Sequence, residues 1–104
     1  MGKKENIKEM INILAIALRH KIGGIVNKDQ IYSSRYAKDA QILIREAEKI
    51  SLSLNLNDYD KSTIRIELKK KLKIELEKKD FLDYKKFDYM DDEIEIVLKD
   101  LGLS

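Results

Sequence analysis

Residues 27–54 read NKDQIYSSRYAKDAQILIREAEKISLSL, and the spacing of side chains in this stretch decides the fold. Six side chains suited to a buried seam follow one another at alternating intervals of four and three residues. They are Tyr36, Ala40, Leu43, Ala47, Ile50 and Leu54. This is the heptad spacing of a helix that packs along another helix. The stretch therefore predicts one long amphipathic helix with a helical partner.

The start of this helix is also marked in the sequence. Asn27 is suited to cap the first turn, and Gln30 stands three residues later, as in a capping box. Val26 can pack on Ile31 as a hydrophobic staple. We expect the helix to begin at this point.

The preceding residues, 4–22, predict another helix. Its apolar side chains share one broad face at 100° per residue. They include Ile7, Met10, Ile11, Leu14, Ala17, Leu18 and Ile22. Gly23 can adopt the left-handed conformation that ends a helix, so we expect the helix to stop there. The short connection to residue 27 then predicts an antiparallel helical hairpin in which the first helix is central to the core.

The next segment can be interpreted in two ways. Ile64, Leu68, Leu72 and Leu76 recur every four residues, as on a helix, but the apolar residues of 63–77 also alternate, as on two strands. The residues between the two alternating runs, 69–71, are all lysine and lack the Gly or Asn of a tight hairpin turn. We therefore predict one helix over 60–79, with a β-hairpin over 63–77 as the alternative that would make the protein α+β.

Residues 80–90 form an aromatic connector, and residues 91–101 predict a last helix. We expect the rings of Phe81, Tyr84, Phe87 and Tyr89 to anchor the connector to the core. Gly102 suits the position after the last helix, and Leu103 could contact Leu98 in a Schellman motif. The sequence thus predicts a single all-α domain over residues 1–104, an up-and-down bundle of about four helices.

Composition narrows the class of protein. The 104 residues are 43% hydrophobic and 38% charged, with no Cys and no Pro, so we expect a packed core without disulfides or a thiolate site. The longest apolar run, residues 13–18, is far shorter than a membrane span, which needs about 20 residues. We expect a cytoplasmic protein that does not enter the membrane. Its abundance of Lys and Glu is typical of thermophile proteins and suggests such a source.

We expect no catalytic, cofactor or metal site. His20 is the single histidine, and it stands between Arg19 and Lys21, which favour its neutral form and repel metal ions. Carboxylate groups occur near residues 55–60 and 88–95, but helix capping and the helix dipole explain both. Gly23-Gly24 follows a helix and matches no phosphate-binding motif.

Charge is distributed unevenly along the chain. Residues 1–79 hold 18 basic and 11 acidic residues, net +7, whereas residues 80–104 hold 3 basic and 8 acidic residues, net −5. The predicted third helix carries a cluster that could contact phosphates without reading base sequence. Its members are Arg65, Lys69, Lys70, Lys71 and Lys73. Sequence-independent nucleic-acid binding is therefore the second functional hypothesis, with the acidic C-terminal segment able to shield this surface.

The first hypothesis is protein–protein interaction. Ile16, Ile31 and Ile42 fall on otherwise polar faces of the first two helices, where they could form an apolar patch. Surplus apolar surface without a catalytic site is typical of an interaction or structural module. We expect a non-enzymatic protein that forms a homodimer or binds a helical partner.

Overall fold

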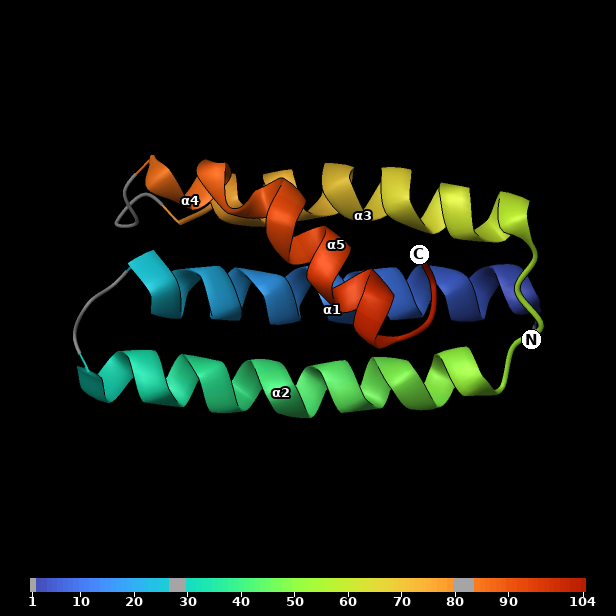
Figure 1. Cartoon of the computed structure of the whole chain (residues 1–104), viewed down its shortest axis with the longest axis horizontal. Helices are drawn as coiled ribbons and strands as arrows, with labels where there is room; N and C mark the ends of the chain where they lie inside the picture. Colours follow the sequence, from blue (N-terminus) through green and yellow to red (C-terminus); the bar gives the residue numbers. More distant parts are fainter. Residues whose placement is uncertain (1, 27–29, 80–83) are drawn as a thin grey trace.

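The computed structural model describes residues 2–26, 30–79 and 84–104 (Figure 1). These residues form five helices: α1 (Lys3–Val26), α2 (Gln30–Leu52), α3 (Asp58–Glu77), α4 (Lys85–Asp88) and α5 (Met90–Asp100). No strand occurs within these three ranges. The predicted all-α class is confirmed.

The β-hairpin alternative for residues 63–77 is wrong, because α3 covers that entire segment. The side chains spaced by four residues are fully buried; they are Ile64, Leu68, Leu72 and Leu76. Ile66 and Ile74, which complete the alternating pattern, are 55% and 49% exposed. Burial at every fourth position is the signature of one helix face, whereas a strand would bury alternate positions. The alternation arises from two additional isoleucines on the solvent side of α3.

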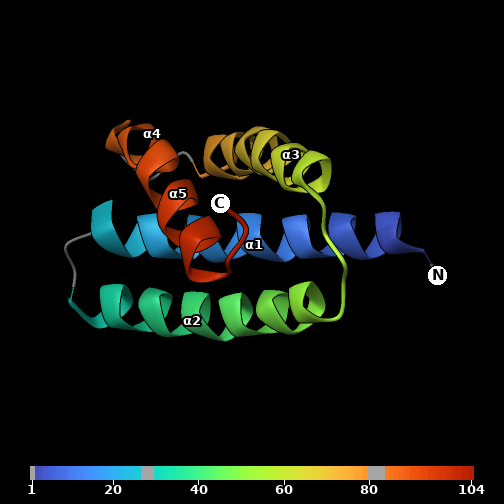
Figure 2. The same ribbon diagram turned by 45° about the vertical axis from the view of Figure 1, so that its right-hand side comes forward.

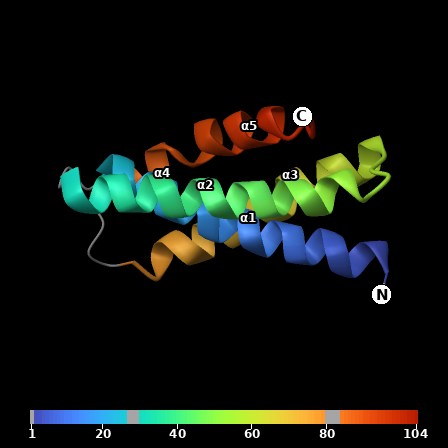
Figure 3. The same cartoon turned by 90° about the horizontal axis from the view of Figure 1, so that it is seen from below.

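The three long helices lie side by side, with α1 between α2 and α3 and with α5 crossing α1 (Figures 1 and 2). Lys3 pairs with Asp60, and Arg19 pairs with Glu75. The offset in residue number is nearly the same in both pairs, so α1 and α3 run parallel. Figure 1 shows α2 running in the opposite direction and α5 returning against α3. Figure 3 shows that α5 lies away from the first half of α1.

The core is built around α1, as predicted. Met10, Leu14, Leu18 and Ile22 of α1 are fully buried. The other helices each contribute side chains to the same cluster: Ile44 and Ala47 from α2, Leu68 and Leu72 from α3, and Ile94 and Leu98 from α5. A single apolar cluster thus joins all four of the longer helices.

The predicted end of the first helix at residue 22 is wrong. α1 continues through Gly23 and Gly24 to Val26, and Gly102 is the one glycine with positive φ among the described residues. A glycine inside a helix costs about 1 kcal/mol relative to alanine. Burying an aliphatic side chain contributes about 1.5–3 kcal/mol. Packing of Val26 against the core offsets the glycine cost and keeps the helix intact.

The second helix agrees with its predicted seam except at the C-terminal end. Ala40 and Ala47 are buried, but α2 ends at Leu52, so Leu54 lies beyond the helix. The expected cap at Asn27 and the side chain of Ile31 fall outside the described residues, and the prediction of a capping box there stays a prediction.

A capping box does form at the start of α3. The Asn57 side chain accepts a hydrogen bond from the Asp60 backbone N–H at 2.8 Å, and Asp60 accepts one from the Asn57 N–H at 3.1 Å. Both bonds satisfy backbone groups that the first turn leaves unpaired. The helix accordingly begins at Asp58, two residues before the predicted start.

The last helix ends in the predicted Schellman motif. Gly102 has φ +70°, its N–H donates to the Lys99 carbonyl at 3.1 Å, and the Leu103 N–H donates to the Leu98 carbonyl at 2.7 Å. Leu103 and Leu98 are both buried in the core cluster. The chain therefore turns back onto the core immediately after α5.

The aromatic connector is anchored by two of its four rings. Phe87 and Tyr89 pack against the core, as predicted. Tyr84 is exposed instead, and Phe81 lies outside the described residues. Residues 85–88 form the short helix α4, which the sequence analysis did not predict.

Candidate functional site

The predicted phosphate-contact cluster is divided between two sides of α3. Arg65 forms an ion pair with Glu95 of α5, and the Lys69 ammonium lies 2.9 Å from Asp91 of the same helix. Two of the five basic side chains are thus neutralised within the protein. The acidic C-terminal helix thus lies along that side of α3, and the shielding of a phosphate-binding surface stays a prediction.

The remaining members of the cluster point elsewhere. Lys70 and Lys71 line a groove on the other side of α3, where Lys70 lies 3.5 Å from Glu67. Lys73 is exposed. At 100° per residue, Lys71 lies about 160° around α3 from Lys69, whereas Lys73 lies only about 40° from Lys69. Lys69 and Lys71 therefore face nearly opposite sides of α3, and phosphate binding by the cluster stays a prediction.

The structure describes two of the three side chains in the predicted isoleucine patch. Ile16 is half-buried on α1, and Ile42 is 53% exposed on α2. The side chain of Ile31 lies outside the described residues. Ile42 is about 200° around α2 from the buried Ala40, so it points away from the core. Docking of a second copy on this patch stays a prediction.

A groove between α1 and α3 is a concave feature of the described residues that the sequence did not predict. Its volume is about 570 Å³. Its lining comprises Lys4, Ile7, Lys8, Ile11 and Asn12 from α1 and Thr63, Glu67, Lys70, Lys71 and Ile74 from α3. We call this feature the α1/α3 groove. The sequence did contain one indication of the groove. Ile74 lies outside the buried stripe of its helix, near Lys70 and Lys71.

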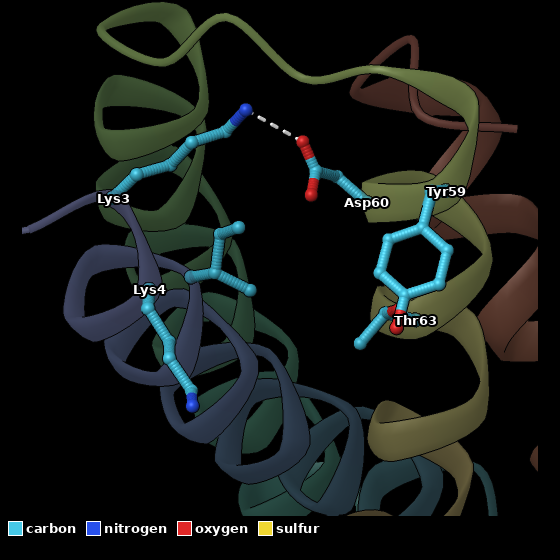
Figure 4. A pocket seen from close by; sticks show the side chains of 6 residues that line it. Lys3, Lys4, Tyr59, Asp60 and Thr63 are labelled. Carbon is cyan, nitrogen blue, oxygen red and sulfur yellow. Dashed lines mark ion pairs between the residues drawn. The ribbon is translucent and has the colours of Figure 1, made fainter.

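The groove continues toward the N-terminal ends of both helices (Figure 4). There a space of about 450 Å³ shares Lys4 and Thr63 with the main groove and is bordered by Tyr59. Figure 4 shows Lys3 reaching from α1 to Asp60, and their charged atoms lie 2.6 Å apart. The hydrogen bond from Lys3 and the Asn57 backbone N–H lower the pKa of Asp60. This ion pair holds the helix ends together across the groove.

The opposite end of the α1/α3 interface carries a second ionic group. Glu75 is buried, and its carboxylate lies 3.1 Å from Arg19 of α1 and 2.9 Å from Lys78. The hydrogen bond from Lys78, with the positive charges of Lys78, Arg19 and Lys71, lowers the pKa of Glu75. A buried carboxylate is stable only with such partners. Arg19 and Glu75 are 56 residues apart, so sequence spacing did not indicate this pair.

Further charges are buried where α1 meets α4 and α5. The Lys21 ammonium lies 2.6 Å from the buried Glu93 carboxylate. Lys86 is also buried and donates a hydrogen bond to the Lys79 carbonyl at 2.8 Å. These contacts satisfy charges that would otherwise oppose folding. Each of these charged groups thus has a partner within the protein.

His20 packs between α1 and α2. Because α1 continues to Val26, the histidine lies inside the helix, part-buried, with its ring centroid 5.8 Å from that of Tyr36. Burial lowers its pKa, and the Arg19 charge lowers it further. The neutral ring therefore packs against α2.

Four residues near 55–60 and 88–95 that carry side-chain oxygens have other partners. Asn57 and Asp60 form the capping box, and Asp91 and Glu95 pair with basic residues of α3. Within the described ranges, no group of three or more His, Cys, Asp or Glu side chains is placed to hold a metal ion.

Comparisons with protein-family models, with curated proteins and with solved structures give no match. In the part of the chain that the structure describes, none of the helices has the length and apolar character needed to cross a membrane. The exposed groove and side chains of this molecule therefore carry the functional proposal.

Proposed function

We propose that this protein is a non-enzymatic interaction module that self-associates or binds another protein through exposed apolar side chains. The α1/α3 groove supports this proposal most directly, because it joins apolar walls from two helices on a side that α5 does not cover. Ile42, Ile66 and Ile74 are each about half exposed and add apolar surface on α2 and α3. An exposed apolar groove marks an interaction site more often than singly scattered apolar side chains do.

Self-association is tested by sedimentation and light scattering over a wide range of protein concentration. We expect the mean mass to rise with concentration and Ile42→Asp to reduce that rise. Ile96→Asp is the matched control, because Ile96 is 50% exposed on α5 and lies outside the predicted patch. A constant monomer mass, together with no partner in a pull-down, would contradict the proposed function.

Sequence-independent nucleic-acid binding is the second candidate. It is supported by Lys70 and Lys71, which line the α1/α3 groove where no α5 residue contributes, and by the exposed Lys73. Fluorescence anisotropy with mixed-sequence DNA and RNA at about 50 and about 200 mM salt tests it, because phosphate contacts weaken steeply with salt. Binding that is lost in a Lys70/Lys71/Lys73→Glu variant supports this function, and no binding at low salt excludes it.

We also infer a cytoplasmic location and a thermophilic source. Arg45 pairs with both Glu48 and Asp100, and Glu75 pairs with both Arg19 and Lys78. Ion-pair networks of this kind stabilise proteins more at high temperature. A thermal midpoint near about 50 °C, which is ordinary for mesophile domains, would contradict the thermophilic source.

A further inference from the structure

We propose that the α1/α3 groove binds an acidic amphipathic helix from a partner protein. This inference rests on the proposed interaction function and adds the chemistry of the partner. Three properties of the groove carry it: its walls, its length and its charge.

The walls of the groove present side chains, and their described residues include no strand edge to which a peptide could hydrogen-bond. The described parts of the groove belong to helices, whose backbone N–H and C=O groups bond within each helix. A peptide cannot add itself as a strand to such a surface, because strand addition requires an exposed sheet edge. The groove must therefore recognise the side chains of its partner. An amphipathic helix suits such a groove, because its apolar residues, spaced by three and four, all face the groove. Ile7, Ile11 and Ile74 provide the matching apolar wall.

The length of the groove suits a helix of several turns. On α3 its lining extends from Tyr59 to Ile74. Fifteen residues of α-helix span about 22 Å. The ion pairs Lys3–Asp60 and Arg19–Glu75 join α1 and α3 near the two ends of this span. A partner helix of about four turns would fill the groove and cover Ile74.

The charge of the lining selects an acidic partner. Five lysines line the groove and its continuation, two from α3 and three from α1, against the two acidic residues Asp60 and Glu67. The net charge of the lining is +3. Lys4 and Lys8 stand on α1, and Lys70 and Lys71 stand on α3, so positive charge flanks the apolar wall from both helices. A helix with an apolar stripe between Asp and Glu residues complements this arrangement.

The probe is a synthetic peptide of about 16 residues, which matches a span of about 22 Å. It carries Leu at positions i, i+3, i+4 and i+7 and Glu beside them. One control peptide replaces each Leu by Ser and keeps the charge. Another replaces each Glu by Lys and keeps the apolar stripe. Each is titrated into the full-length protein, with affinity measured by anisotropy and the contact surface mapped by amide chemical shifts.

α3 supplies matched control variants. Ile74→Asp changes a residue of the groove, whereas Ile66→Asp changes a similarly exposed isoleucine of the same helix that does not line it. Lys71→Glu and Lys73→Glu form a second pair, because only Lys71 lines the groove. We expect Ile74→Asp to weaken binding about tenfold, a loss of about 1.4 kcal/mol. Ile66→Asp and Lys73→Glu should leave affinity within about twofold, and Lys71→Glu should weaken it measurably at low salt.

Binding of the Leu/Glu peptide, with shifts confined to the groove and sensitivity to Ile74→Asp, supports the inference. Equal binding of the Ser control would overturn it, since charge alone would then suffice. Tighter binding of the Lys control, or shifts located elsewhere, would also overturn it. So would a single-stranded oligonucleotide that displaces the peptide and binds more tightly, because the groove would then be a nucleic-acid site.

The experiments distinguish failure of the acidic-helix inference from failure of the proposed interaction function. Absence of peptide binding by a protein that still self-associates through Ile42 removes the acidic helix and keeps the interaction module. Absence of both, together with no partner in a pull-down, removes the proposed function as well. Circular dichroism of every variant verifies folding, which the exposure of Ile66 and Ile74 leads us to expect.

Discussion

The two sides of α3 have similar compositions and different surroundings. On one side, Arg65 and Lys69 pair with acidic residues of α5. On the other, Lys70 and Lys71 line an open groove beside the half-exposed Ile74. Basic side chains occur on both sides, so their charge alone does not distinguish them. The difference shows that the position of α5 decides which basic side chains are neutralised and which remain available.

Packing of apolar side chains holds α5 against the core beside α3. Ile94, Val97 and Leu98 of α5 are buried in the common core, whereas Lys69 and Asp91 are mostly exposed. Exposed ion pairs contribute about 0–1 kcal/mol, and each buried aliphatic side chain contributes about 1.5–3 kcal/mol. The ion pairs on the covered side of α3 are therefore a consequence of the docking of α5 more than its cause.

The largest change to the covered side should come from Leu98→Ala. Leu98 is fully buried, and its truncation leaves a cavity under α5. We expect a loss of about 3 kcal/mol in the free energy of unfolding, measured by urea denaturation. Ile96→Ala, on the exposed surface of α5, should cost less than about 0.5 kcal/mol. Equal losses for the two variants would mean that α5 is not held by its buried face.

The next largest effect should come from Glu75→Gln, at the α1/α3 interface. The substitution leaves Arg19 and Lys78 without their charged acceptor, which we expect to cost about 2 kcal/mol near neutral pH. Because the folded state lowers the pKa of Glu75, its stabilisation is present above the ordinary glutamate pKa. That stabilisation is lost as pH falls through the folded-state value.

Urea titrations of both proteins across acidic pH measure this dependence. The gap in stability between the native protein and the Gln variant should shrink as pH falls, because protonation removes the same charge. A gap that stays constant, or widens toward acid, would contradict the assigned role of the Glu75 carboxylate.

A smaller effect is expected where α5 ends. Gly102 has φ +70°, and an added Cβ would meet no atom within 4 Å, so the cost of a side chain there is conformational. We expect Gly102→Ala to lower the free energy of unfolding by about 1 kcal/mol. Gly102→Asn should cost less, since Asn enters the left-handed region more readily. If both variants unfold like the native protein, the Schellman motif does not hold the end of α5.

The smallest effect should come from the ion pair on the covered side. Asp91→Asn removes the exposed partner of Lys69, and we expect a change of less than about 0.5 kcal/mol that salt reduces further. Thermal melts at low and high salt measure it. A loss comparable to that of Leu98→Ala would show that charge, not packing, docks α5 on α3.

Local sequence patterns predicted most of the helices and their buried faces. The stripe from Ile64 to Leu76, the core face of α1 and the Schellman turn at Gly102 each depend on side chains within a few residues of one another. The same local reasoning failed at Gly23, where it predicted the end of a helix. The cost of glycine is local, but the burial that offsets it comes from contacts with the rest of the core.

The candidate site was predictable only in part, for the same reason. The basic residues of α3 were identified, but their division between α5 and the groove was not, because it depends on where a later helix docks. The burial of Glu75 and Lys86 was not predicted, because it depends on how the helices pack together.

The sequence by itself determined where the long helices form and which faces they bury, because helix periodicity, capping and turn geometry act over one or two turns. Only the tertiary structure decided that α1 and α3 run parallel and enclose a groove, that α5 covers one side of α3, and which lysines stay exposed. Those properties depend on contacts such as Arg19–Glu75, between residues 56 apart in the chain, and no local pattern encodes which distant side chains will meet.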